Sequence, residues 1–226
     1  MAIQQYLMMA NRATTTAGRE LKTGALYTMG VNWNGQLGNG DTVNHTFDPV
    51  QVLGGTEWQN TANMNDTYQA VAVKSDGTLW SWGNGIYGAL GHGNTTSLST
   101  PTQVGSDTDW QSAVTTGTSS TAAIKTNGTL WTWGKNDYGQ LGHGDLVQRT
   151  SPVQVGALTD WHATIPHDNR TFYWLKTDGT IWLSGNRTGL SNATSPVQLG
   201  SDTDWTDAWQ GYADGTTNQN MFLMKA

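Results

Sequence analysis

An internal repeat of about fifty-one residues constrains the fold of this chain more than any other feature of its sequence. Residues 79–94 read LWSWGNGIYGALGHGN, and residues 130–145, which lie 51 positions later, read LWTWGKNDYGQLGHGD. Such a repeat has to be recognised before any motif within it is interpreted, because a repeated packing motif can resemble a functional site.

Three markers keep this spacing along the chain. A lysine occurs at intervals of 52, 51, 51 and 49 residues, at Lys22, Lys74, Lys125, Lys176 and Lys225. A proline two residues before a glutamine stands at Pro49, Pro101, Pro152 and Pro196, and a tryptophan follows each proline by nine residues, at Trp58, Trp110, Trp161 and Trp205. The sequence therefore contains four repeat units.

Each unit contains four strand candidates separated by turn residues. In the third unit these are residues 130–134, 151–156, 160–165 and 171–176. Successive units are joined by Asp-Gly or Asn-Gly, where we expect hairpins in which both turn residues adopt positive φ. Four antiparallel strands in about fifty residues are typical of a β-propeller blade.

We therefore predict an all-β, β-propeller-like domain over residues 21–226, which follows an N-terminal arm at residues 1–20. It consists of four repeat units of about 51 residues, each a four-stranded antiparallel blade. Because propeller blades pack face to face, both sides of each sheet are covered. We predict that the structural core of the repeat contains Trp80, Trp82, Trp110, Trp131, Trp133, Trp161, Trp182 and Trp205.

Composition narrows the classes of function. The chain has no cysteine, which excludes disulfides and thiolate chemistry, and its net charge of −6 argues against nucleic acid as the main partner. The first twenty residues lack the basic and apolar segments of a secretory signal, and no apolar run is long enough for a membrane span. We expect no nucleic-acid partner and no membrane partner.

The histidines and aspartates offer weak candidate sites. His92 and His143 occupy equivalent Gly-His-Gly loops where the first unit has Asn39, which favours a structural role over metal binding. His162 and His167 have no acidic partner that would make a site of them. The SDTDW segments at 106–110 and 201–205 lack the spacing of a calcium loop and are interpreted as turns.

No catalytic triad, phosphate loop or carboxylate pair stands out from the repeat, and the loop glycines are interpreted as parts of a bulged turn. We predict a protein that is not an enzyme, with no catalytic residues, no cofactor and no metal.

The N-terminal arm contains a candidate partner-binding cluster formed by Ile3, Tyr6, Leu7, Met8 and Met9. Methionine side chains adapt to irregular contacts, so this cluster is suited to docking on another subunit. The alternative is a disordered leader.

The segments LWTWGKNDYGQLGHGD, TSPVQV and AIKTNGTLW resemble the repeat of the regulator of chromosome condensation family, over about residues 21–225. The resemblance implies a propeller, which in that family has seven blades. It implies no single function, because the fold serves as exchange factor, inhibitor and phage module alike.

Three features depart from the family pattern. The chain has four units, its fourth unit has a shortened glycine loop between Gly185 and Pro196, and about twenty residues precede the first repeat and match nothing in it. Since Lys22 and Lys225 mark the same phase of the repeat, three outcomes stay open: the ring closes with four blades, remains an arc, or is completed by a second copy.

We expect a structural protein of a tailed-phage virion, acting as a capsid decoration or tail accessory subunit. It would bind other virion proteins or copies of itself in a large assembly, and would be located in the virion after assembly in the host cytoplasm. The grounds are the lack of a catalytic set, cysteine or secretion signal, the apolar arm, and a resemblance to short phage repeats. The alternatives are a cytoplasmic scaffold or adaptor that binds a protein with one propeller face, and a propeller-type protein inhibitor.

Overall fold

The computed structural model describes residues 24–61, 68–117, 119–168, 170–186, 192–210 and 221–225. Within these residues every regular element is a β-strand except one short 3-10 helix, η1 (Ile86–Gly88). The N-terminal arm, with its predicted cluster Ile3, Tyr6, Leu7, Met8 and Met9, lies outside the described residues.

Three antiparallel four-stranded sheets form the body of the molecule, and in each sheet the strands pair in chain order. The first sheet contains β3 (Trp58–Thr61), β4 (Gln69–Lys74), β5 (Leu79–Gly83) and β6 (Leu98–Gln103). The second contains β7 (Trp110–Thr116), β8 (Ser120–Lys125), β9 (Leu130–Gly134) and β10 (Arg149–Gln154). The third contains β11 (Trp161–Asp168), β12 (Thr171–Lys176), β13 (Ile181–Gly185) and β14 (Ala193–Gln198).

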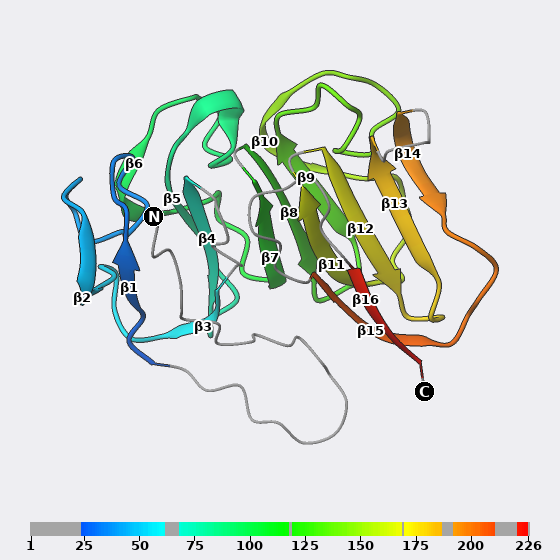
Figure 1. Ribbon diagram of the computed structural model, residues 1–226, viewed down its shortest axis with the longest axis horizontal. Helices are drawn as coiled ribbons and strands as arrows, with labels where there is room; N and C mark the ends of the chain where they lie inside the picture. The colour runs from blue at the N-terminus through cyan, green and yellow to red at the C-terminus, as the bar shows by residue number, and fades with distance from the viewer. Residues whose placement is uncertain are drawn as a thin grey trace.

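Two two-stranded sheets flank these three blades. One pairs β1 (Tyr27–Gly30) with β2 (His45–Gln51), and the other pairs β15 (Trp205–Gln210) with β16 (Met221–Lys225). By their place in the repeat, β15 and β16 correspond to the first two strands of a blade, and β1 and β2 to the last two. Figure 1 shows β1 and β2 at the left edge of the molecule, and β15 and β16 next to the third blade. The predicted all-β propeller fold is confirmed, and its fourth set of strands is divided between the two ends.

The sequence unit and the blade are offset from each other. The hairpin that joins two sequence units lies inside one sheet, between its second and third strands. The same register recurs in each blade, with Val73 opposite Leu79, Ile124 opposite Leu130 and Leu175 opposite Ile181. Strands β5 and β9 begin at the equivalent residues Leu79 and Leu130, as the repeat period predicts.

The hairpin turns differ from the sequence-based expectation in one respect. Gly77 has a φ of 78° and its N–H donates to the Lys74 carbonyl over 2.9 Å, but among the described non-glycine residues only Tyr87 has a positive φ. The prediction that both turn residues adopt positive φ is therefore wrong. The Asp76 carboxylate instead accepts hydrogen bonds from the Thr78 N–H and hydroxyl, at 3.0 and 2.6 Å, and so stabilises a turn in which only the glycine is left-handed.

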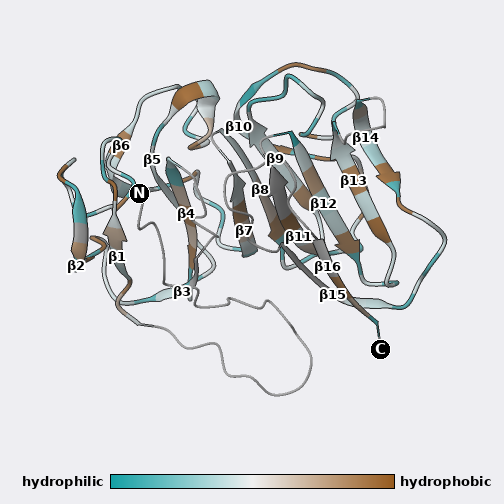
Figure 2. Cartoon of the chain, viewed as in Figure 1, coloured by the Kyte–Doolittle hydropathy of each residue, from teal (hydrophilic) through white to brown (hydrophobic). Residues whose placement is uncertain are grey.

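The hydrophobic core lies between neighbouring sheets. One cluster joins Val73 and Leu79 of the first blade to Trp110 and Trp133 of the second, and the next cluster joins the second blade to the third. Every residue of β4, β8 and β12 is buried, which explains why these strands lack polar alternation. Figure 2 shows the hydrophobic segments along β4, β12 and β13.

Candidate functional site

A lysine held between two tryptophans recurs in every complete blade. The Lys74 Nζ lies 4.8 Å from the ring centre of Trp58 and 4.2 Å from that of Trp80 in the first blade. We call this arrangement the lysine clamp. Its counterparts are Lys125 with Trp110 and Trp131, at 4.8 and 4.9 Å, and Lys176 with Trp161 and Trp182, at 4.8 and 4.5 Å. A cation over two aromatic faces stabilises the blade it joins.

The SDTDW segment supplies the acidic partners of the clamp. The Lys125 Nζ lies 2.6 Å from Asp107 and 3.0 Å from Asp109. Burial opposes the charged lysine, but its hydrogen bonds to the two aspartates raise the Lys125 pKa. Sequence reasoning interpreted this segment as a turn and missed its lysine partner, which lies on the next strand of the blade. Within the described ranges, no three His, Cys, Asp or Glu side chains converge on a metal position.

The second tryptophan of each LWxW strand contacts the loop of the preceding unit. Trp82 and Trp133 are almost fully buried, and their Nε1 atoms donate to the carbonyls of Gln36 and Ala89, both over 2.9 Å. These bonds fasten one blade to the unit before it.

In the third blade Ser184 stands at this position. Its hydroxyl donates to the Gln140 carbonyl over 2.7 Å and so replaces the indole donor. The lost volume is restored by Trp174 on the neighbouring strand, whose ring centre lies 6.3 Å from that of Trp161, just as Trp133 lies 6.5 Å from Trp110. Sequence analysis did not identify Trp174 as a core residue, because it stands outside the repeat pattern.

The glycine-rich loops dock on the outer strand of the next blade. A Cβ at Gly88 would lie 2.5 Å from the Cα of Thr150, and one at Gly139 would lie 2.7 Å from the Cα of Thr194. The Gly93 N–H also donates to the Thr150 carbonyl over 2.8 Å. The glycines are therefore required by close approach to a neighbouring blade as well as by the turn itself.

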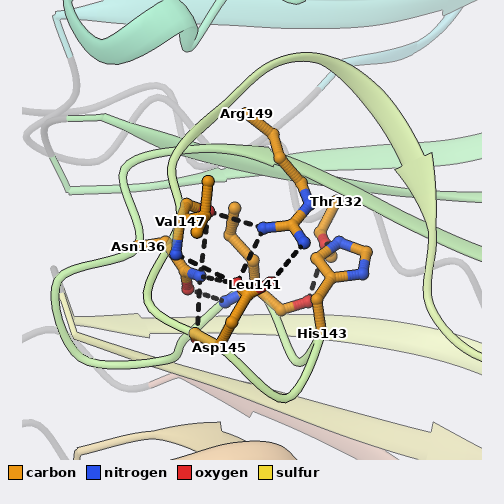
Figure 3. Close-up of polar contacts among 7 residues, drawn as sticks. All are labelled: Thr132, Asn136, Leu141, His143, Asp145, Val147 and Arg149. Atoms are coloured by element: carbon orange, nitrogen blue, oxygen red, sulfur yellow. Dashed lines mark hydrogen bonds and ion pairs between the residues drawn. The ribbon is translucent and has the colours of Figure 1, made fainter.

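Inside the loop of the third unit, a buried asparagine organises the backbone (Figure 3). The Asn136 Oδ1 accepts the Leu141 N–H at 2.9 Å, and its Nδ2 donates to the carbonyls of Asp145 and Val147 at 3.0 and 3.1 Å. Arg149 binds Asp145 through two hydrogen bonds of 3.0 and 2.9 Å. These bonds, together with that from the Val147 N–H, lower the Asp145 pKa to about 2.

The two loop histidines form local hydrogen bonds in separate blades. The Thr132 hydroxyl donates its proton to the Leu141 carbonyl over 2.7 Å. The His143 Nε2, which lies 2.9 Å from the Thr132 hydroxyl oxygen, is therefore the donor in the contact between these two side chains. Ser81 and His92 repeat this arrangement, with a 3.0 Å contact. Burial lowers the pKa of both histidines, and the nearby Arg149 guanidinium helps to bring that of His143 to about 4.

For the other two candidate histidines, His162 and His167, the described residues give only their positions on β11. His162 is partly buried on β11, and the side chain of His167 lies outside the part of the chain whose burial is described.

The loops present apolar side chains to solvent at their tips. Trp33 is 68% exposed, and Ile86, in the corresponding part of the next loop, is 50% exposed. Val43, in the same loop as Trp33, and Val147, in the loop of the third unit, are also exposed. We call Trp33, Val43, Ile86, Tyr87 and Val147 the loop face. Figure 2 shows its hydrophobic segment around η1.

Cations from the following blade lie over two loop tyrosines, one of which, Tyr87, belongs to the loop face. The Lys135 Nζ lies 4.8 Å from the ring centre of Tyr87, and the Arg170 guanidinium lies 4.9 Å from that of Tyr138. Tyr87 has a φ of 60°, an uncommon conformation for a bulky residue that is associated with functional or strained sites.

Two equivalent grooves lie between adjacent blades. The groove beside His92, Trp110 and Trp131 has a volume of about 440 Å³, and the one beside His143, Trp161 and Trp182 has a volume of about 300 Å³. Their repetition follows from the repetition of the blades.

The family model of the regulator of chromosome condensation (RCC1) repeat matches residues 23–61, 76–124 and 127–164. The chain therefore belongs to the RCC1 repeat family. It is 34% identical to the ultraviolet-B receptor UVR8 of Arabidopsis thaliana over 176 residues, which cover 75% of this chain and 40% of the receptor. It is 29% identical to the E3 ubiquitin-protein ligase HERC2 of Homo sapiens over 176 residues, which cover 69% of this chain and 4% of the ligase. The chain thus spans less than half the length of either relative.

Solved structures share the fold. Prp20p of Saccharomyces cerevisiae superposes with a TM-score of 0.69 at 16% identity, covering 82% of this chain and 49% of that chain. Yeast RCC1 (Prp20) in its structure with Kap60 gives a TM-score of 0.66 at 15% identity, and the match covers 92% of this chain and 56% of that chain.

The described residues contain no helix that is long and apolar enough to cross a membrane.

Proposed function

We propose that the protein is a non-enzymatic interaction module that binds a protein partner through its loop face. The observation that carries this proposal is the exposure of Trp33, at 68%, together with that of Ile86 and Tyr87 in the next loop. Tryptophan and tyrosine are enriched among the residues that dominate binding energy, and exposed apolar patches mark interaction surfaces.

Structures of the same fold support protein binding as the class of function. Prp20p has binding properties to Gsp1p and histones, and yeast RCC1 (Prp20) has been solved with Kap60 bound. These partners belong to those proteins. What supports the proposal for this chain is its own loop face, which the rigid blades hold in place.

The test uses the full chain as bait, together with the variant Trp33→Ala and a control variant. Val197→Ser is a suitable control because Val197 is also exposed but lies on β14, the outer strand of the third blade. We expect a specific partner to be retained by the wild type and by Val197→Ser, and to be bound at least about tenfold more weakly by Trp33→Ala, the loss typical of an interface hot spot. Equal binding by all three folded baits would contradict the proposal.

A narrower form of the proposal makes the chain a virion structural protein of a tailed phage, either a capsid decoration or a tail accessory subunit. Its support is the sequence: the short repeats, the apolar arm and the absence of a catalytic set. Co-sedimentation of the purified chain with tailed-phage particles tests it. Capture of a single cytosolic protein without particle binding would favour an intracellular adaptor instead, the alternative that agrees with the partner complexes of the same fold.

A further inference from the structure

The lysine clamp is incomplete in the C-terminal half-blade. The Lys225 Nζ lies 4.6 Å from the ring centre of Trp205 and has both aspartates, Asp202 at 2.9 Å and Asp204 at 3.0 Å. Its side chain is nevertheless 41% exposed, whereas the side chains of Lys125 and Lys176 are 10% and 7% exposed. Within the described ranges β16 pairs only with β15, so no described third strand brings the second aromatic ring that every complete blade has.

The N-terminal half-blade presents a strand of this kind. Tyr27 on β1 stands at the repeat position of Trp80, Trp131 and Trp182, and it is 51% exposed. Among the described strands β1 pairs only with β2, and no described strand lies on the edge that faces the second strand in a complete blade. An open strand edge is a template for pairing with another chain.

We propose that β16 of one copy pairs with β1 of a second copy. The half-blades β15–β16 and β1–β2 then form a four-stranded composite blade, and Tyr27 of the second copy completes the clamp around Lys225 of the first. The register of the three complete blades fixes the register of this joint. In the first blade Val73 lies opposite Leu79, so the proposed joint places Met224 opposite Leu26. Ala72 lies opposite Trp80, so the joint places Leu223 opposite Tyr27.

The arrangement of the blades favours a second copy over closure within one chain. The three complete blades lie between the two half-blades in chain order, and Figure 1 shows β1 and β2 at the left edge of the molecule, whereas β15 and β16 lie beyond the first two blades, next to the third. One chain covers 49% and 56% of the two solved yeast propeller chains, so two copies span about the length of one such propeller. A head-to-tail joint repeated twice closes into a ring of two copies.

Sedimentation velocity of the full chain across a range of concentrations is the first test. We expect a species of twice the 24.4 kDa chain mass. The substitutions Lys225→Ala and Tyr27→Ser should each weaken self-association at least about tenfold, as the loss of an interface hot spot does. Lys135→Ala is the control, because it removes a lysine from the ring of Tyr87, which belongs to neither half-blade. This substitution should leave self-association unchanged. A chain that stays monomeric at all concentrations would overturn the proposal.

Disulfide trapping tests the register, because the chain has no cysteine of its own. The Lys74 N–H donates to the Thr78 carbonyl, so the adjacent pair Val73 and Leu79 belongs to the closer, non-hydrogen-bonded type. The matching positions in the joint, Leu26 and Met224, are therefore near enough for a disulfide.

A mixture of Leu26→Cys and Met224→Cys chains should cross-link, and a mixture of Met29→Cys and Met224→Cys chains should not. If the double variant Leu26→Cys with Met224→Cys forms its disulfide at monomer mass, the ring closes within one chain and the second copy is excluded.

Discussion

At the scale of single residues, the repeat is held together by a few side chains that each perform several tasks. Trp133 fills the space between two blades and donates a hydrogen bond to Ala89 of the preceding loop. Lys125 and Lys176 are charged but nearly enclosed by tryptophan rings and aspartates, which is tolerable because each of these charges is paired. Stability and the mutual position of the blades therefore rest on the same residues.

We expect Trp133→Ala to lower the free energy of unfolding by about 3–5 kcal/mol, because a fully buried indole is removed and its cavity cannot collapse. Trp131→Ala should cost less, since Trp131 is only partly buried. Urea denaturation of both variants measures the difference. A larger loss for Trp131→Ala would show that the clamp, and not the interblade core, dominates stability.

His143→Asn should change stability at neutral pH by less than about 1 kcal/mol, the scale of one hydrogen bond, because Asn39 stands at this place in the first unit. The effect of pH is more specific. The folded-state pKa of His143 is lowered from 6.5 to about 4, so below pH 6.5 the unfolded chain binds a proton that the folded chain does not. Wild-type stability therefore falls between pH 6.5 and about 4.

Denaturation of His143→Asn across this pH range should show a smaller fall than the wild type, with the curves parallel above about pH 7, where the histidine is neutral in both states. Identical slopes for the two proteins below pH 6.5 would mean that His143 protonates as readily in the folded state as in the unfolded one.

At the scale of elements, the glycine loop is the part that couples one blade to the next. Gly139 has a φ of 77° and lies against the backbone of Thr194 on β14. Asn136 holds the same loop from inside, so the loop reaches its neighbour as a preformed unit. In the fourth unit the segment from Gly185 to Pro196 spans 11 positions, against 18 from Gly134 to Pro152 in the third unit.

Gly139→Ala should therefore destabilise the protein by more than the strain of a left-handed alanine. Gly156→Ala is the matched control, since Gly156 has a φ of 59° and a methyl group at its Cα would meet no atom within 4 Å. We expect Gly156→Ala to lower the free energy of unfolding by roughly 1–2 kcal/mol. Gly139→Ala should lower it by about 1–3 kcal/mol more, because the backbone of the neighbouring strand has to move. Equal losses in thermal or urea unfolding would show that the docking is not tight.

At the scale of the whole molecule, three complete blades follow one another along the chain, with one half-blade before them and one after them. If the half-blades join two copies, assembly and stability are linked. The thermal midpoint of the wild type should then rise with protein concentration, because only the folded chain can form the joint. Lys225→Ala should lose this dependence, which differential scanning calorimetry at several concentrations can measure.

The N-terminal arm makes a separate prediction. Deleting residues 1–12 should leave a folded protein by circular dichroism, because these residues precede the repeat. It should weaken co-sedimentation with tailed-phage particles, because the arm would add a contact to that of the loop face. Binding at full strength by the truncated chain would assign the contact to the propeller, and unfolding would make the arm part of the fold.

Much of this structure could be predicted from the period of the sequence. Because each unit repeats its strands and turns, Leu79 and Leu130 had to begin equivalent strands, and the tryptophans two residues apart had to share a face. The loop face could not be predicted in this way, because the exposure of Trp33 and Ile86 depends on what the neighbouring blade covers. The pairing of Lys125 with Asp107 likewise joins residues from different parts of one blade.

The sequence by itself therefore determined the number of units, the antiparallel strands and the repeat family, because local turn chemistry and a fixed period are written in the order of residues. Only the tertiary structure decided how the strands are shared among sheets, why Gly139 cannot carry a side chain, and how Trp174 compensates for Ser184. Those outcomes depend on contacts between blades, which bring together residues about fifty positions apart in the sequence. A local sequence pattern cannot show which of these residues fills the space between two blades.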